Sequence, residues 1–244
     1  MPGYYVPGLT AASSAVEIAG EEFHHIAHVM RHGVGDALQL SNGTGVLALA
    51  TIERMGKRAL EATITSTRVY EKSTPRLACA FSLLRSKHDH MIVEKLTELG
   101  VHAFFPFTSQ RSVRQPSGNT AEKFAAVAVA AMKQCDGAFL PTVHGTRPLR
   151  PALEHLQEMG YTPLVASEAE QSNLLPVVLG QVHGDVCLVI GPEGGWSDEE
   201  RAWFASAGLR TVSLGNHILR AETAAIAGAA MVVGHNLHGN HEFY

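Results

Sequence analysis

The sequence predicts an α/β protein in which a domain with a mainly parallel sheet follows a small β-barrel domain. From residue 77 onwards, short apolar runs of strand type alternate with segments of helical periodicity, which is typical of layered α/β domains. Before residue 70 the pattern is one of short strands separated by glycine turns. The polar segment at residues 72–75 ends in proline and suits a linker, so we expect domains at residues 1–72 and 73–244.

Composition limits the class of protein. The chain has 244 residues, of which 45% are hydrophobic and 17% charged, and this is enough to bury a substantial core. No apolar run approaches the roughly 18 residues of a membrane helix, and the N-terminal residues lack the pattern of a signal peptide. The three cysteines, Cys79, Cys135 and Cys187, are widely spaced and odd in number, which favours a reducing compartment. We therefore expect a cytoplasmic protein with no membrane partner.

The charge distribution does not by itself indicate a nucleic-acid partner. The formal net charge is −4, whereas RNA-binding proteins usually carry a basic surface. The halves differ: residues 1–116 hold 12 Lys and Arg against 10 Asp and Glu, or +2, and residues 117–244 hold 7 against 13, or −6. Any phosphate-facing surface should therefore draw mainly on the first half.

In the N-terminal part we expect one helix among several strands. The strands are expected at residues 37–40, 45–52 and 59–69. The helix, at residues 21–31, carries His24, His25 and His28. Histidines at i and i+4 could pair as metal ligands, but no further ligand completes a set in this pattern, so we expect no metal site.

The second part alternates strands and helices. Strands are expected at residues 77–84, 101–107 and 163–167, and helices at residues 90–99, 121–132 and 149–159. This alternation is the basis for expecting a mainly parallel sheet.

The most informative stretch begins at residue 185. Val186–Ile190 is a continuous apolar run with β-branched residues at three of its five positions, which suits a strand buried on both faces of a parallel sheet. Gly191 and Pro192 end this strand, and Gly194 and Gly195 allow a tight turn that a ligand can approach closely.

A second loop follows after a predicted helix and strand. Ser197 and Glu200 have the spacing of a capping box that starts the helix, and residues 211–214 are expected to form the strand. In the loop beyond, apolar residues flank Arg220 and Glu222 directly before an Ala-rich helix. Two backbone-rich loops at neighbouring strand ends form a slot suited to an adenine ring and a ribose. The alternative is a purely structural turn; the P-loop and dinucleotide fingerprints are absent.

Both loops carry a resemblance to a known family. The segments G-P-E-G-G-W-S-D-E-E (residues 191–200) and L-G-N-H-I-L-R-A-E-T-A (residues 214–224) resemble the two C-terminal motifs of the bacterial 16S ribosomal RNA (uracil-N3)-methyltransferase family. That family belongs to the SPOUT class. The resemblance therefore implies a trefoil-knotted parallel-sheet domain that binds S-adenosyl-L-methionine and forms a homodimer. General topology rules would not predict a knot.

The resemblance extends over nearly the whole chain. Residues 20–36 resemble a segment of the family's PUA-like N-terminal barrel, which grips RNA, and the implied partner is 16S rRNA within the small ribosomal subunit. Candidate RNA-binding residues are Arg31, Lys87 and Arg111. Arg31 could equally be an ordinary surface residue and Lys87 part of a solvated face, while Arg111 could instead position the cofactor loops.

The cofactor site implied by the resemblance lies in the two loops and at the end of a neighbouring strand. Its expected residues are Ser167, Ile190, Gly191, Pro192, Glu193, Gly194, Gly195, Leu214, Gly215, Ile218, Leu219 and Arg220.

The chemistry needs a cation near the uracil oxygens and a proton acceptor. Arg220 keeps its proton at all relevant pH values, so it can stabilise the oxyanion that develops as uracil loses its N3 proton. Glu222 or Glu193 could take that proton. For Glu222 the alternative is a carboxylate placed at a helix N-terminus because the dipole favours it there.

Departures from the family pattern leave other functions open. Gly3, Gly137 and His217 stand where the family usually has basic residues, or has one nearby. The leading hypothesis is a methyltransferase acting on N3 of a uridine in 16S rRNA. The alternatives are a SPOUT methyltransferase acting on a different RNA and a non-catalytic RNA-binding or ribosome-assembly protein of the same fold.

Overall fold

The computed structural model describes residues 3–239, and the chain divides into two units. The first comprises the residues up to Lys72 together with residues 129–140, and the second comprises the remaining residues. Each unit is described by itself.

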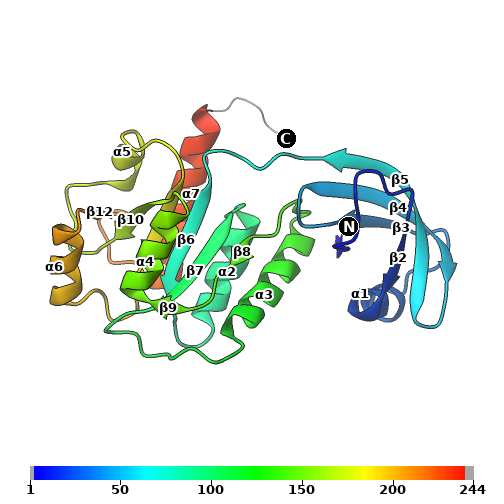
Figure 1. The fold of residues 1–244 in the computed structure, drawn as a ribbon, viewed down its shortest axis with the longest axis horizontal. Coiled ribbons are helices and arrows are strands. Elements are labelled where there is room, and N and C mark those ends of the chain that lie inside the picture. The colour runs from blue at the N-terminus through cyan, green and yellow to red at the C-terminus, as the bar shows by residue number, and fades with distance from the viewer. Residues whose placement is uncertain (1–2, 240–244) are drawn as a thin grey trace. The chain divides into compact units, whose positions relative to one another are not determined.

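The first unit is built on a curled five-stranded sheet with the order β1-β3-β4-β5-β2 (Figure 1). Its strands are β1 Tyr4–Tyr5, β2 Ala15–Ala19, β3 Ala37–Ser41, β4 Val46–Met55 and β5 Ala59–Val69. Strands β3, β4 and β5 lie where the sequence predicts strands. Alternate residues of β4 are buried, as expected for a sheet with one face towards a core.

The helix expected at residues 21–31 is instead two short segments. The α-helix α1 spans Gly20–His24, and a π-helical turn spans His25–Val29. The wider turn is closed by the Met30 N–H, which donates to the carbonyl of His25 at 2.9 Å. Phe23 and Ile26 are both buried in the core of the sheet, whereas Val29 at the end of the segment is exposed.

Residues 129–140 belong to the first unit because polar contacts join them to it. The Gly3 N–H donates to the carbonyl of Lys133 at 2.8 Å, and the Lys133 ammonium lies 2.7 Å from the carboxylate of Glu22. The Ser41 hydroxyl donates to the carbonyl of Gly137 at 2.9 Å. The first part of this segment is the end of helix α3, Thr120–Gln134.

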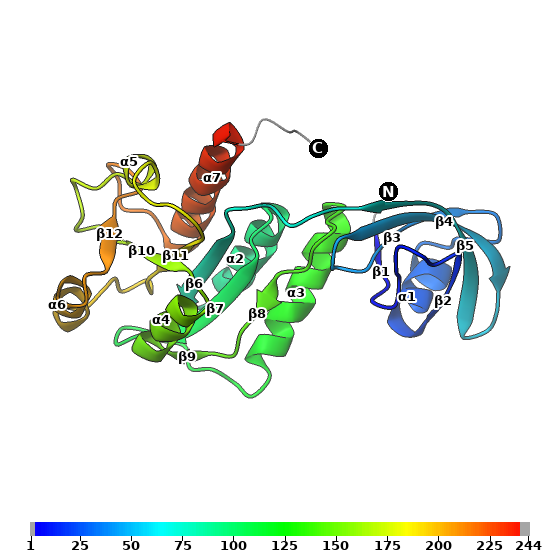
Figure 2. The same cartoon turned by 45° about the horizontal axis from the view of Figure 1, so that its top comes forward.

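The second unit contains a seven-stranded parallel sheet with the order β12-β10-β11-β6-β7-β8, and β9 also pairs with β7. The strands are β6 Leu77–Ser82, β7 Ala103–Thr108, β8 Thr142–Val143, β9 Arg147–Pro148, β10 Thr162–Ala166, β11 Val186–Ile190 and β12 Arg210–Val212. The helices, besides α3, are α2 His88–Glu98, α4 Leu149–Glu158, α5 Leu175–Leu179, α6 Asp198–Ser206 and α7 Ala221–Gly239. Figure 2 shows the same elements from a second direction.

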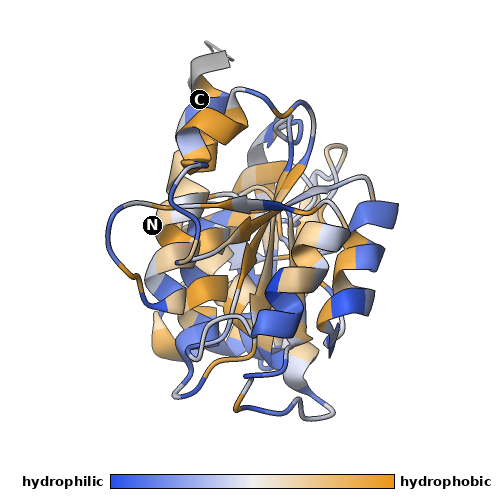
Figure 3. Ribbon diagram, turned by 90° about the vertical axis from the view of Figure 1, so that its left-hand side faces the viewer, coloured by the Kyte–Doolittle hydropathy of each residue, from blue (hydrophilic) through white to orange (hydrophobic). Residues whose placement is uncertain are grey.

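Both faces of this sheet are covered. Cys187 and Val189 of β11 share a core with α4 and α6, whereas Leu188, which points the opposite way, contacts α7. At that contact a Cβ added to Gly228 would lie 3.0 Å from the Leu188 side chain, so glycine allows α7 to approach the sheet closely. Every residue of β6 and β11 is buried, and the strands of the sheet are coloured mainly hydrophobic in Figure 3. No helix within residues 3–239 combines the length and the hydropathy needed to cross a membrane.

Candidate cofactor and catalytic cavity

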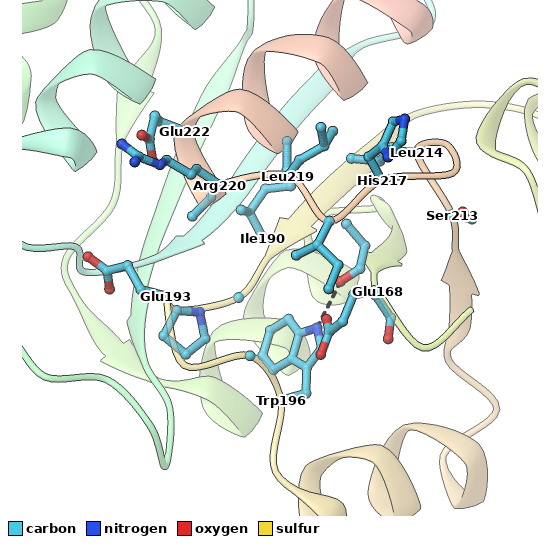
Figure 4. Close-up of a pocket in the computed structure, with 18 of the residues that line it drawn as sticks. Glu168, Ile190, Glu193, Trp196, Ser213, Leu214, His217, Leu219, Arg220 and Glu222 are labelled. Carbon is cyan, nitrogen blue, oxygen red and sulfur yellow. Dashed lines mark hydrogen bonds between the residues drawn. The ribbon is translucent and has the colours of Figure 1, made fainter. Parts of the chain in front are cut away.

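A cavity of about 1210 Å³ opens outside the carboxyl ends of β10, β11 and β12 (Figure 4). Ligands of open parallel sheets bind at this edge, because the loops that leave the strands converge there. The lining includes every residue that the sequence nominates for the cofactor: Ser167, Ile190, Gly191, Pro192, Glu193, Gly194, Gly195, Leu214, Gly215, Ile218, Leu219 and Arg220. Glu222 lines it as well.

The first wall of the cavity is the glycine loop, which we define as residues 191–195. Gly195 adopts φ +66°, and a Cβ on it would lie 2.8 Å from Oε1 of Glu168. A Cβ on Gly191 would lie 2.9 Å from the ring of Trp196. The buried Trp196 ring leaves no room for a side chain at Gly191, and the positive φ of Gly195 strains any residue other than glycine, so the backbone of the loop borders the cavity.

The glycine loop is held in place by side chains from other elements. The Arg111 guanidinium donates to the carbonyl of Gly194 at 3.0 Å. The indole N–H of Trp196 donates to the carbonyl of Ala166 at 2.8 Å, which ties the end of the loop to β10. Trp196 is itself 1% exposed and stacks on Phe107, so the loop is anchored in the core.

The capping box predicted at the start of α6 is confirmed. Ser197 Oγ accepts from the Glu200 N–H at 3.0 Å, and the Glu200 carboxylate accepts from the Ser197 N–H at 2.9 Å. The same carboxylate also accepts from the backbone of Gln110 at 2.9 Å, so the cap connects the glycine loop to the segment that carries Arg111.

The second wall is the loop at residues 214–220, which we call the second loop. The Gly215 N–H donates to Ser213 Oγ at 3.4 Å, and this hydroxyl donates to the Gly215 carbonyl at 3.2 Å. The side chains directly beyond this turn are exposed to solvent, and Ile218 is 83% exposed. A large apolar side chain this exposed at a cavity rim is available to contact a ligand.

Charged groups gather at one end of the cavity, where Figure 4 shows Arg220, Glu222 and Glu193. Arg220 is exposed, while Glu222 is 9% exposed and lies in the first turn of α7. The Nδ1 atom of His88 is 3.7 Å from Oε1 of Glu222. Glu193 Oε1 accepts the backbone N–H of Arg85 at 2.9 Å. A cation and two carboxylates therefore border the same space.

The three residues nominated for RNA binding are not among the residues that line this cavity. Arg31 is exposed in the first unit at φ +59°, directly after the π-helical turn. Lys87 is exposed at φ +62°, just before α2. Arg111 holds the glycine loop, which is the alternative role considered for it from the sequence.

Among the cavity-lining residues that sequence reasoning missed are Arg85, His88, Glu168 and Trp196. Trp196 and Glu168 each lie next to a nominated residue, so proximity in the sequence could have indicated them. Arg85 and His88 are more than a hundred residues away from the glycine loop, and they reach the cavity because β6 pairs with β11.

In the cavity lining, the carboxylate of Glu170 accepts several hydrogen bonds. The Thr211 hydroxyl donates to it at 2.8 Å, and the backbone N–H groups of Ser172 and Asn173 donate at 2.8 and 3.1 Å. These bonds, the one from Thr211 above all, lower the pKa of Glu170 to about 2. The carboxylate is thus ionised and fixes the segment after β10.

A parallel sheet with a cavity at the carboxyl ends of its strands, walled by a glycine loop, defines an α/β protein of the class that binds nucleotide-like ligands. The sequence matches an RNA methyltransferase domain over residues 71–233 and an RNA methyltransferase PUA domain over residues 18–65. The chain belongs to this RNA methyltransferase family.

Relatives of known name are similar to this chain over most of their length. Ribosomal RNA small subunit methyltransferase E of Mycobacterium bovis is 29% identical over 236 residues, which cover 94% of this chain and 90% of the relative. The Bacillus subtilis protein of the same name is 29% identical over 217 residues, with 85% of each chain covered. A crystal structure of a ribosomal RNA small subunit methyltransferase E from Neisseria gonorrhoeae, bound to S-adenosyl methionine, is 26% identical and superimposes with a TM-score of 0.84, covering 94% of this chain and 95% of that one.

The expected fold class is confirmed: a SPOUT-type trefoil-knotted parallel-sheet domain follows a PUA-like β domain. In this chain the five strands of the β domain form a curled half-barrel with an open strand order.

Proposed function

We propose that this protein transfers a methyl group from S-adenosyl-L-methionine to N3 of a uridine in 16S rRNA. The observation that supports this most is the cavity, where both loop motifs converge in a chain of the RNA methyltransferase family. The relatives named as ribosomal RNA small subunit methyltransferases favour the small-subunit RNA as the substrate.

The residues of the cavity fit S-adenosylmethionine. The absence of side chains at Gly191 and Gly195 leaves backbone groups next to the cavity, suited to an adenine and a ribose. A cavity for one ligand of this size usually measures about 300–1,000 Å³, so about 1210 Å³ leaves room for part of an extruded base beside it. Four carboxylates line the space against two arginines, which suits a ligand with a net positive charge: Glu168, Glu170, Glu193 and Glu222 against Arg85 and Arg220.

We assign the holding of the cofactor to the glycine loop, the second loop and Ser167. Ser167 directly follows β10 and is 9% exposed, and its backbone N–H donates to the carbonyl of Val212 in β12 at 3.0 Å. When bound, S-adenosylmethionine supplies an electrophilic methyl group and a neutral thioether leaving group. The protein then has to orient the uracil ring, exclude water and accept one proton.

Arg220 is the residue to stabilise the substrate during the reaction. Its guanidinium is exposed at the rim, where a base would enter, and it stays protonated while negative charge develops on the uracil oxygens. Glu222 and Glu193 border the same end of the cavity and are the candidates for the proton acceptor.

We further propose that Arg31 and Lys87 contact RNA phosphates, while Arg111 acts mainly through the glycine loop and could also reach RNA. Arg31 and Lys87 are exposed cations, as phosphate contacts require. Replacing Arg31 or Lys87 with alanine should weaken RNA binding about equally for all RNA sequences and make the binding less dependent on salt.

We also propose a cytoplasmic homodimer. The small residues of α7 permit close approach of another backbone, although at Gly228 this approach is already made by Leu188 of the same chain. Sedimentation at micromolar concentration tests this proposal, and a monomer would contradict it.

The test of the proposed function is mass-spectrometric mapping of modified uridines in 16S rRNA from cells with and without this protein. We expect one N3-methyluridine to disappear with the gene and to return when purified protein and S-adenosylmethionine are added to small subunits from the deleted strain. A modification that disappears from a different RNA would show that this other RNA is the substrate. No change in any RNA would favour a non-catalytic protein.

A further inference from the structure

The two candidate proton acceptors in the cavity have different surroundings. Glu193 is exposed, and its Oε1 accepts the backbone N–H of Arg85. Glu222 is 9% exposed, and its Oε1 lies 3.7 Å from Nδ1 of His88. Glu222 therefore faces a titratable side chain, whereas the hydrogen-bond partner of Glu193 is a backbone amide that cannot exchange charge with it.

His88 is placed between a buried carboxylate and the solvent. It is the first residue of α2, it lines the cavity, and its side chain is 35% exposed. Histidine changes its charge between about pH 5 and 8 and has two ring nitrogens, so one can accept a proton while the other releases one. The distance to Glu222 is longer than a hydrogen bond, but catalytic contacts are commonly this long before the substrate binds.

We propose that Glu222 is the proton acceptor and that His88 is a positioning residue which acts through it. This inference rests on the proposed methylation of uracil N3. The N3–H bond breaks and its proton goes to the Glu222 carboxylate, while the N3 electron pair forms the bond to the methyl carbon. The bond between that carbon and the sulfur breaks with its electron pair on sulfur. Glu222 then passes the proton to Nδ1 of His88, whose Nε2 releases a proton to solvent and so restores the carboxylate.

The other charged groups near His88 come from several elements. Lys87 and Asp89 flank it in the sequence, and Asp89 is paired with Arg114 and His90. From other elements, the cavity brings Arg220 just before α7, Glu222 in the first turn of α7, and Glu193 in the glycine loop. Asp89 is thus already engaged by Arg114 and His90, which leaves Glu222 as the carboxylate that responds to the charge of His88.

The sign of the pH dependence follows from this pairing. Neutral His88 leaves the Glu222 carboxylate free to take a proton. A cationic His88 pairs with the carboxylate and cannot accept a further proton, so it opposes the transfer. The methylation rate should therefore fall as the pH falls through the range in which histidine gains its charge, between about pH 5 and 8.

The test compares His88→Gln with His90→Gln in multiple-turnover methylation at saturating S-adenosylmethionine and small subunits, because the Glu222 carboxylate has to be restored before each new turnover. His90 is a matched control because it lies on the same helix and pairs with Asp89 outside the cavity lining. We expect His88→Gln to lose about tenfold in rate at pH 8, less than the about hundredfold that a direct acid–base group supplies. The inflection between pH 5 and 8 should disappear in this variant, while His90→Gln keeps it.

Two further measurements separate this role from a purely structural one. Added imidazole should restore part of the rate of His88→Ala, because it can take the proton in the space that the ring leaves. S-adenosylmethionine affinity, measured by calorimetry, and the melting temperature should stay unchanged in both His88 variants. An unchanged pH profile in His88→Gln, a failure of imidazole to rescue the folded His88→Ala protein, or a loss of cofactor binding would each overturn the proposal.

The wild-type protein separates this result from a failure of the proposed function. If wild-type protein forms no N3-methyluridine in small-subunit RNA, the proposed function fails. If it does so and His88→Gln behaves like wild type at every pH, the role of His88 alone is rejected.

Discussion

The glycine loop and the second loop line the same cavity, but the rest of the protein fixes the glycine loop more firmly than the second loop. The carbonyl of Gly194 in the glycine loop is held by the guanidinium of Arg111, and the loop ends at a tryptophan buried in the core. The second loop is tied at its first turn, between Ser213 and Gly215, and leaves Ile218 83% exposed. One wall is preformed, and the other presents side chains that a ligand can cover.

This difference indicates a division of labour between cofactor and substrate. A preformed backbone wall binds a small ligand without an ordering cost, which suits a cofactor that is the same in every turnover. An open wall that carries Arg220 suits a base that has to be moved out of an RNA stack before it can react. Changes in the glycine loop should therefore act on cofactor binding, and changes in the second loop on the rate of methylation.

The largest effect is expected at Gly195. Gly195→Val should abolish S-adenosylmethionine binding, because the added Cβ meets Glu168 at 2.8 Å and the branched side chain extends further into the lining. Gly208→Val is the matched control: its φ is +65° against +66°, and nothing lies within 4 Å of its added Cβ. Both variants should lose about 1–2 kcal/mol of unfolding free energy from the strained backbone. Calorimetry should then show binding to the Gly208 variant alone, and binding to both would contradict the preformed wall.

The next largest effect is expected at Arg220, in the open wall. Arg220→Ala should slow methylation about a hundredfold or more, since losing an oxyanion partner costs about 3–4 kcal/mol, with S-adenosylmethionine affinity nearly unchanged. Arg220→Lys should recover part of the rate because it keeps the charge but not the planar fork. Higher pH should partly rescue the alanine variant as more uracil ionises unaided.

Single-turnover kinetics and calorimetry check this prediction together. Arg210→Ala serves as the control, because Arg210 is an exposed arginine of β12 outside the cavity lining. If Arg220→Ala loses cofactor affinity while its rate at saturation is unchanged, Arg220 is a cofactor ligand. The proposed separation, with the glycine loop binding the cofactor and the second loop acting on the substrate, would then be wrong.

Local patterns predicted much of the fold and about half of the cavity lining. The buried strand Val186–Ile190 and the capping box of Ser197 and Glu200 were read from residues close together in the chain, because burial on both faces and helix capping depend on short-range spacing. The two loops follow from these elements directly. Their residues then meet in one cavity because parallel strands end at the same edge of a sheet.

Contacts between distant segments could not be predicted in this way. Residues 129–140 group with the first unit through Lys133 and Gly137, although they continue a helix that begins in the second unit. The pattern around His88 reads as an ordinary helix start, and its contact with Glu222 depends on α2 packing against α7. Hydrophobic periodicity indicates which face of a helix or strand is buried, but it does not indicate which other element packs against that face.

A smaller effect is expected at Arg111, which supports the preformed wall from outside. Arg111→Met keeps the stem of the side chain beside Gly194 and removes the hydrogen bond to its carbonyl. Losing a hydrogen bond from an exposed charged group costs about 1 kcal/mol, so the dissociation constant of S-adenosylmethionine should rise about fivefold. If calorimetry shows unchanged cofactor affinity while RNA binding weakens and becomes less dependent on salt, Arg111 is an RNA contact.

The smallest effect is expected at Glu170, which lines the cavity and fixes the segment after β10. Hydrogen bonds from Thr211 and from the backbone of Ser172 and Asn173 lower the pKa of Glu170 to about 2, from an ordinary value of 4.5. A carboxyl whose pKa is depressed by folding stabilises the native state fully above its unfolded-state pKa, and this contribution is lost as the pH falls towards the folded-state value.

Glu170→Gln should therefore lower the melting temperature at pH 7 by about 2 °C, a modest shift because the group is partly exposed to solvent. The difference between variant and wild type should shrink between pH 4.5 and about pH 2, as the wild-type carboxyl takes up its proton. Glu154→Gln is the control, since Glu154 is an exposed carboxylate on α4 outside the cavity lining. Thermal unfolding at pH 7, 5 and 3 measures both variants. A difference for Glu170→Gln that stays constant at all three pH values would show that its hydrogen bonds hold the segment regardless of charge.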